Sequence, residues 1–222
     1  MASTLDQLSN GRLDLGLGLG NPTPHQAVFG LDETGPGGRL KRFTGHLAAM
    51  KALFSDGKAT VESGERTVNG VPMEPKPVQR PAPKIWFGGR HPNALRRAAE
   101  LADGWMGAGS STTEDFTSQA EAMREVLSSA GRAADSFRIA KRLYVAVDSD
   151  EARAARRLRE WFEQYYGRPQ LADRVCVWGS LEKVMDEVGR VTGAGAEMVL
   201  LNPLFDQTMH LRALSEAIDK GR

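Results

Sequence analysis

The sequence contains almost no cysteine, no excess of charge of either sign and no long apolar run. Its single cysteine, Cys176, excludes an intrachain disulfide and leaves too few thiolates for a structural zinc site. The 29 Lys and Arg residues balance the 28 Asp and Glu residues, and a net charge of +1 argues against a nucleic acid as the main partner. Apolar runs such as 198–201 are too short to span a bilayer, and the first residues lack the pattern of a secretory signal. We therefore expect a cytoplasmic protein that binds neither a membrane nor a nucleic acid.

The four histidines form no recognisable catalytic or metal-binding pattern. No two of His25, His46, His91 and His210 have metal-ligand spacing near a carboxylate, so we expect no metal site. His46 lies in a helical pattern and is expected to be a surface or packing residue. Cys176 lies in an apolar run and is expected to be a buried small hydrophobe rather than a nucleophile. The sequence names no catalytic residue.

The sequence does contain enough apolar residues for a core, 41% of the chain, and a regular alternation of strand and helix patterns. The predicted strands are 13–20, 84–87, 105–108, 137–147 and 197–201, and a hairpin is predicted at 58–68. The predicted helices are 39–54, 92–102, 111–130, 148–166, 180–193 and 210–219. This order predicts an α/β fold in which helices pack on a parallel sheet. No linker rich in Pro, Gly or Ser separates two halves, so we expect one domain over residues 1–222.

Residues with capping chemistry mark several helix ends. Ser111, Asp148 and Ser180 are the candidate N-caps. The pair Asp103–Gly104 is a candidate left-handed cap at the end of the helix before it.

Glycine occupies one whole face of the first predicted strand. Residues 13–20 alternate leucine with other residues, and Gly16, Gly18 and Gly20 fall on the face opposite the leucines. Beside Gly16 and Gly18 we expect large side chains of neighbouring elements to fill the space of a barrel interior. Gly20 stands at the end of the strand, where it offers room for a flat ring.

The turn from Gly88 to Asn93 is the most informative candidate site. It joins a predicted strand to a predicted helix, at the end of a strand where parallel α/β folds bind their ligands. Gly88 and Gly89 let backbone amides approach a ligand, the helix N-terminus adds partial positive charge, and Arg90 adds a full one. His91 could donate a further hydrogen bond to an anion. These features favour a phosphate site; the alternative is a plain tight turn with a surface arginine, and the spacing is not that of a Walker loop.

Several segments, taken in order, resemble the luciferase-like monooxygenase superfamily. The quoted segments are TLDQLSNGR at 4–12 followed by LGLG at 15–18, PKPVQRP at 75–81 leading into IWFGG at 85–89, ALRRAAELADGW at 94–105, and GAGAE at 193–197 with LNP at 201–203. The resemblance covers nearly the whole chain. Each segment alone is weak, and their combination in this order is specific.

The resemblance implies a TIM-type (β/α)8 barrel that binds FMN or the deazaflavin coenzyme F420 and acts on a small organic substrate. The implied chemistry is hydride transfer, or oxygen activation with monooxygenation, and the resemblance does not choose between the two cofactors. In related proteins the cofactor phosphate is held by the loops after the fourth and fifth strands. These correspond here to the loop from Gly20 to Arg39 and the turn from Gly88 to Asn93. The resemblance therefore adds Gly20 and Arg39 to the residues of the turn as candidate cofactor ligands.

In the family, the motif around 4–6 ends the third helix of the barrel. The resemblance therefore implies a partial barrel, with strands four to eight present and the first three strand–helix units absent. A late start codon, a fragment and a naturally shortened paralogue are the competing explanations. The last of these leaves a second functional reading, a non-catalytic cofactor-binding or assembly module that forms a homodimer through its open sheet edges.

Overall fold

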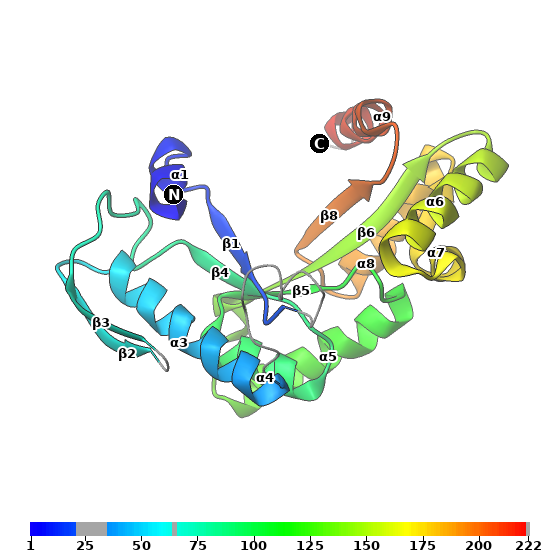
Figure 1. Cartoon of the computed structure of the whole chain (residues 1–222). Helices are drawn as coiled ribbons and strands as arrows, with labels where there is room; N and C mark the ends of the chain where they lie inside the picture. The colour runs from blue at the N-terminus through cyan, green and yellow to red at the C-terminus, as the bar shows by residue number, and fades with distance from the viewer. Residues whose placement is uncertain (21–34, 64–65, 221–222) are drawn as a thin grey trace. The chain divides into compact units, whose positions relative to one another are not determined.

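The structure, a computed structural model, describes residues 1–20, 35–63 and 66–220 of the chain (Figure 1). By its internal contacts the chain divides into two compact units, Met1–Trp86 and Phe87–Arg222. The division falls between two consecutive residues of one strand, β4 (Lys84–Phe87).

The first unit is built around one long helix. Its elements are α1 (Ala2–Leu8), β1 (Asp14–Leu17), α3 (Pro36–Phe54), β2 (Ala59–Ser63) and β3 (Arg66–Val71). A proline in its first turn favours the start of α3, because that turn needs no amide donor from it. The strands β2 and β3 pair antiparallel, which confirms the predicted hairpin, and β2 packs along α3.

A buried carboxylate fixes α1 to the proline-rich segment 75–81. Asp6 is fully buried and accepts hydrogen bonds from the Gln79 backbone amide at 2.9 Å and from Gln79 Nε2 at 2.8 Å. The same Nε2 donates to the carbonyl of Leu13 at 2.6 Å, and Ser3 Oγ donates to the carbonyl of Pro75 at 2.6 Å. These bonds hold a segment that is neither helix nor strand against α1.

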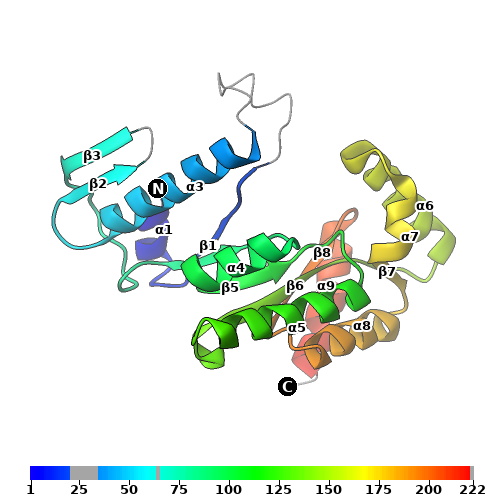
Figure 2. The same ribbon diagram turned by 90° about the horizontal axis from the view of Figure 1, so that it is seen from below.

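The second unit contains the larger run of alternating strands and helices. Its elements are α4 (Pro92–Leu101), β5 (Gly104–Gly107), α5 (Thr113–Ser129), β6 (Arg138–Val147), α6 (Glu151–Tyr166), α7 (Ala172–Val175), β7 (Cys176–Gly179), α8 (Leu181–Gly193), β8 (Met198–Pro203) and α9 (Gln207–Lys220). Neighbouring helices α4, α5 and α8 pack side by side (Figure 2).

The central strand of this unit is β6, which pairs in parallel with β5, β7 and β8. Tyr144 and Val145 pair with both β7 and β8, so these two strands lie on opposite edges of β6. By the same reasoning β5 and β8 lie on opposite edges, and β5 and β7 follow one another along one edge. A parallel sheet flanked by helices matches part of a TIM barrel, which confirms the predicted fold class.

The two faces of β6 pack against different helices. Tyr144 and Ala146 belong to a buried cluster with Leu158 and Phe162 of α6. Lys141 alternates to the other face, where its ammonium lies 5.8 Å from the ring centre of Phe116 on α5. Alternate side chains of β6 therefore face α6 and α5.

Several predicted boundaries are wrong in detail. The N-cap of α5 is Thr112 rather than Ser111, and that of α6 is Asp150 rather than Asp148, whereas Ser180 caps α8 as predicted. Gly104 lies inside β5 and is not a left-handed cap. The sequence analysis missed β7 altogether. No helix among the described residues is both long and apolar enough to cross a membrane.

Candidate functional site

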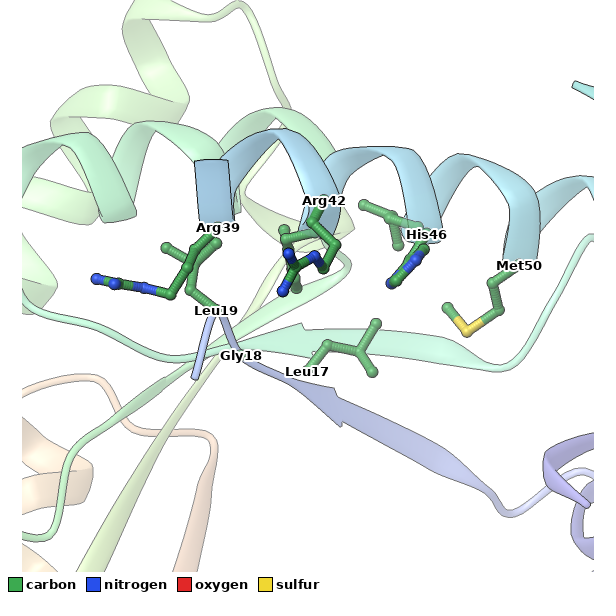
Figure 3. Close-up of a pocket in the computed structure, with 9 residues that line it drawn as sticks. Leu17, Gly18, Leu19, Arg39, Arg42, His46 and Met50 are labelled. Atoms are coloured by element: carbon green, nitrogen blue, oxygen red, sulfur yellow. The ribbon is translucent and has the colours of Figure 1, made fainter. Parts of the chain in front are cut away.

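A pocket of about 300 Å³ lies in the first unit between the end of β1 and one face of α3 (Figure 3). Its lining residues are Leu17, Gly18, Leu19, Arg39, Arg42, Phe43, His46, Leu47 and Met50. Arg39, Arg42, His46 and Met50 share one face of α3 because they are spaced by three or four residues. The pocket therefore combines apolar walls with two guanidinium groups and an imidazole, a chemistry that suits an amphipathic anion.

The structure places the predicted residue Arg39 in this pocket, and Gly20 directly follows its lining residue Leu19. Gly20 is exposed and has a φ of +71°, a left-handed conformation that favours glycine. Residues 21–34 of the predicted loop lie outside the described residues. The sequence analysis missed Arg42 as a site residue and expected His46 only on the surface or in packing. His46 is exposed and also lines the pocket, and its spacing from Arg39 was the available signal.

The glycine face of β1 is open rather than filled. A Cβ atom added at Gly16 or Gly18 would meet no atom of the described residues within 4 Å. The expectation that large neighbouring side chains fill this space is therefore wrong for these residues. The missing side chains leave the backbone of β1 accessible next to the pocket that Gly18 lines.

The predicted phosphate turn lies in the second unit and depends on one glycine. Gly89 has a φ of +107°, and a Cβ there would lie 2.8 Å from the Cβ of Ala94. Trp105 Nε1 donates a 2.8 Å hydrogen bond to the Gly89 carbonyl and so fixes the turn to β5. A side chain at position 89 would both strain the backbone and collide with α4.

The amino end of α4 carries unsatisfied donors and positive charge. His91 is the N-cap, and its Nδ1 accepts a hydrogen bond from the amide of Asn93 at 3.2 Å. Asn93 Oδ1 accepts from Arg96. In the part of the chain that the structure describes, the amides of Gly89, Arg90 and His91 donate to no other group. The exposed Arg90 side chain adds a full charge, so the turn can bind an oxyanion.

The structure thus brings together Gly88, Gly89, Arg90, His91 and Asn93 at the start of α4. Gly20 and Arg39 belong to the first unit.

A buried lysine holds the loop that follows β5. Lys141 is fully buried, and its Nζ donates to the carbonyls of Ala108 and Ser111 at 2.6 and 2.7 Å and to Ser111 Oγ at 3.1 Å. Burial lowers the pKa of Lys141 to about 8. The sequence analysis missed this residue, because nothing in the local pattern shows that a lysine in a strand would be buried.

The remaining candidate chemistry is sparse. Cys176 is buried, as expected, and burial raises the pKa of its thiol, which disfavours the thiolate form that a nucleophile needs. Across residues 1–20, 35–63 and 66–220, no three His, Cys, Asp or Glu side chains gather where they could hold a metal ion.

Residues 1–195 match the family model described as luciferase-like monooxygenase. The chain is 30% identical over 133 residues to phthiodiolone/phenolphthiodiolone dimycocerosates ketoreductase of Mycobacterium kansasii, covering 59% of this chain and 35% of the relative. It is 31% identical over 152 residues to 5,10-methylenetetrahydromethanopterin reductase of Archaeoglobus fulgidus, covering 68% of this chain and 43% of the relative. The chain therefore spans less than half the length of these curated relatives.

Solved structures share the fold. An F420-dependent secondary alcohol dehydrogenase in complex with an F420-acetone adduct superposes with a TM-score of 0.84 and 19% identity, covering 100% of this chain and 73% of that one. Monooxygenase RslO1 from Streptomyces bottropensis superposes with a TM-score of 0.71 and 21% identity, covering 96% of this chain and 69% of that one.

Proposed function

This chain belongs to the luciferase-like monooxygenase family, and from that premise we propose that it acts as an oxidoreductase that binds FMN or coenzyme F420. Relatives and structural neighbours include an F420-dependent dehydrogenase and a monooxygenase. The cofactor, when bound, would supply hydride transfer or oxygen activation toward a small organic substrate. The protein's contribution is to bind and orient that cofactor and to shape the substrate site.

The observation that carries this proposal is the turn at the start of α4. Both candidate cofactors carry a phosphate group, and the turn offers free amides at Gly89, Arg90 and His91 beside a helix N-terminus. Gly89 fits this role because its missing side chain lets the chain pass close to α4. We assign Gly88 and Asn93 to the same cradle, and Arg90 to the charge that offsets the phosphate.

His91 is placed to release its present hydrogen bond when an anion binds. Its imidazole now accepts the hydrogen bond of the Asn93 amide. A phosphate oxygen could take that bond in its place, which would free the exposed imidazole to donate to the same anion. In the first unit, we assign Gly20 and Arg39 to cofactor contacts as well, because Arg39 lines a pocket with apolar walls and Gly20 directly follows the pocket residue Leu19.

A titration with two flavins tests the charge of the turn. We expect the full chain to bind FMN more tightly than riboflavin, which lacks the phosphate. Arg90→Gln should remove a charge-assisted contact of about 1.5–3 kcal/mol, about 10- to 150-fold in FMN affinity, while riboflavin affinity stays unchanged. Arg156→Gln is the matched control, since Arg156 is an exposed arginine on α6 whose ion pair in the described part of the chain is with the exposed Glu160. Equal FMN-to-riboflavin ratios in Arg90→Gln and wild type would contradict the phosphate assignment.

A glycine pair tests the backbone of the turn. Gly89→Ala should weaken FMN binding at least as much as Arg90→Gln, because its Cβ meets Ala94 and disturbs the cradle. Gly131→Ala is the control: Gly131 also has a positive φ, +65°, but open space around it, so the variant introduces positive-φ strain without a collision, far from the turn in sequence. Flavin and F420 titrations of both variants, with thermal unfolding in parallel, separate lost affinity from lost stability. Cofactor binding without any turnover would favour the alternative of a non-catalytic module.

A further inference from the structure

Arg142 is a partly buried arginine without a polar partner. It lies on β6, and in the described part of the chain its guanidinium forms no ion pair and no hydrogen bond. Other arginines of the same unit are engaged: Arg138 pairs with Glu197 at 3.6 Å, and Arg159 pairs with Asp173 at 2.7 Å. An arginine carries five N–H donors, and buried donors are normally hydrogen-bonded. A half-buried arginine that uses none of them is therefore a candidate to bind a ligand that supplies the acceptor.

The surroundings of Arg142 hold its side chain in place without neutralising it. Its guanidinium carbon lies 5.0 Å from the ring centre of Tyr144, two residues further along the same face of β6. The hydroxyl of Tyr144 lies 2.9 Å from that of Tyr166, and Phe162 packs edge-on against the Tyr144 ring at 5.2 Å. The ring under the arginine is therefore fixed by α6, which keeps the guanidinium pre-oriented.

The loop after β5 is pressed against the same arginine. A Cβ added at Gly109 would lie 2.8 Å from Arg142 Nε and 2.7 Å from the Tyr144 ring, so only glycine permits this approach. The turn closes with a bond from the Ser111 amide to the Ala108 carbonyl at 3.2 Å, and the Lys141 ammonium binds both carbonyls of that turn from the other face of β6. The amides of Gly109 and Ser110, in the middle of this turn, donate to no group of the described residues.

The phosphate turn follows the carboxyl end of β4, and the loop beside Arg142 follows the carboxyl end of β5. Trp105 on β5 donates to the carbonyl of Gly89, and Gly107, which ends β5, pairs with Lys141 of β6. A ligand held at the turn after β4 and one held beside Arg142 would thus occupy the same edge of the second unit. This is the edge at which parallel α/β folds bind their substrates.

We propose that Arg142, with the backbone of the Gly109–Ser110 turn, binds the oxyanion group of the substrate, a carboxylate, sulfonate or phosphate. The guanidinium offers paired donors with the geometry of such a group, and the loop adds amides beside it. The assignment deepens the proposed function by naming a substrate class. Its test is made without cofactor, so failure here and failure of cofactor binding are distinguishable.

Proton–nitrogen NMR spectra of the arginine side chains give the test, with benzoate and methanesulfonate as probes and benzamide as the neutral match to benzoate. We expect the Arg142 Nε–H signal, identified by its loss in Arg142→Gln, to shift with both anions in a saturable way and not with benzamide. The Gln variant, followed through the backbone amide signals of Gly109 and Ser110, should bind the anions about 10- to 100-fold more weakly. Arg138→Gln, at the first residue of the same strand, should bind as wild type does.

A second variant guards against misfolding of Arg142→Gln. Gly109→Ala keeps every charge but drives a methyl group against Arg142 and Tyr144, and it should weaken anion binding to a similar extent. Gly193→Ala, in open space at the end of α8, should have no effect on binding. An Arg142 signal that stays still in the anion titrations overturns the proposal. A signal that moves with FMN but not with riboflavin, benzoate or methanesulfonate assigns the site to the cofactor phosphate and also overturns it.

Discussion

Lys141 shows how one buried side chain can fix a loop at the edge of the sheet. Its ammonium has no carboxylate in hydrogen-bond contact among the described residues, and three oxygen atoms of Ala108 and Ser111 satisfy its donors. Placing a cation in the interior is unfavourable unless its donors are all bonded. The loop and the lysine therefore depend on each other, because each would be left unsatisfied without its partner.

Removing the ammonium should destabilise the protein. Lys141→Met keeps the apolar stem but leaves the Ser111 carbonyl without a donor among the described residues, while the Ala108 carbonyl keeps only its bonds from the Ser111 amide and hydroxyl. We therefore expect the free energy of unfolding to fall by about 2–4 kcal/mol. Lys183→Met is the control, because Lys183 is about half exposed, pairs with the exposed Glu151 and lies 5.8 Å from the ring centre of Trp178. Urea unfolding at neutral pH measures both variants, and an unchanged midpoint in Lys141→Met would contradict the role assigned to the ammonium.

The same lysine should leave a signature in the pH dependence of stability. Burial lowers its pKa in the folded protein to about 8, against 10.5 for an unperturbed lysine. Between these two values the unfolded chain binds more protons than the folded one, so stability rises with pH across this window. We expect the wild type to gain stability relative to Lys141→Met as pH rises from about 8 to about 10.5 in urea titrations. Parallel curves for the two proteins would show that the folded pKa is not lowered.

At the scale of elements, the sequence predicted those features that depend on residues close together in the chain. The strand 84–87 has the same bounds in the structure. The turn before α4 could also be predicted, because glycine permits the positive φ found at Gly89 and proline fixes its own φ at the start of the helix. The cap of α5 could not be predicted in this way. Ser111 and Thr112 are both good caps, and the structure uses Thr112 because Lys141 binds Ser111 from a distant strand.

The same reasoning explains the other misses. Asp148 does not cap α6 because Arg153 takes its carboxylate at 2.7 Å, which leaves Asp150 to accept the Arg153 amide. The strand β7 has only four residues and lies in a short apolar run, which periodicity alone cannot assign to a strand or to a buried helix segment, so the sequence did not identify it. Arg142 was missed as a candidate because its importance depends on which face of β6 meets α6, and only the tertiary packing decides that.

The contact between α1 and the proline-rich segment predicts a loss of stability in acid. Burial alone would raise the pKa of Asp6, but hydrogen bonds from the Gln79 side chain and backbone outweigh it and lower the pKa. A lowered folded pKa means that this stabilisation is present above the unfolded value, 3.8, and is lost as pH falls through the folded pKa.

Asp6→Asn tests this contact directly. The new amide would place a donor opposite the Gln79 donors, so we expect a loss of about 1–3 kcal/mol at neutral pH. The difference from wild type should narrow as the solution is made acidic. Asp56→Asn is the control, because Asp56 is exposed and its ion pair with the exposed Arg80, at 3.6 Å, contributes little to stability. Equal stability of Asp6→Asn and wild type at neutral pH would show that the buried carboxylate adds nothing.

At the scale of the whole molecule, the two units share a strand rather than a linker. The division falls between Trp86 and Phe87, which are both buried residues of β4. Boundaries between independent domains fall in exposed and flexible segments where the chain can hinge. One domain therefore stays a prediction, in which neither unit unfolds while the other keeps its native state.

Native-state hydrogen exchange tests this cooperativity, with a variant in one unit and a readout in the other. If the chain is one domain, Asp6→Asn in the first unit should lower the protection of the slowest amides of α5 and β6 in the second unit. The loss should equal the loss in global stability from urea unfolding, because those amides exchange only when the whole chain opens. Lys141→Met should act in the reverse direction on the slowest amides of α3. If Asp6→Asn lowered the exchange protection of α3 but left that of α5 and β6 unchanged, the chain would consist of two separately folding domains instead.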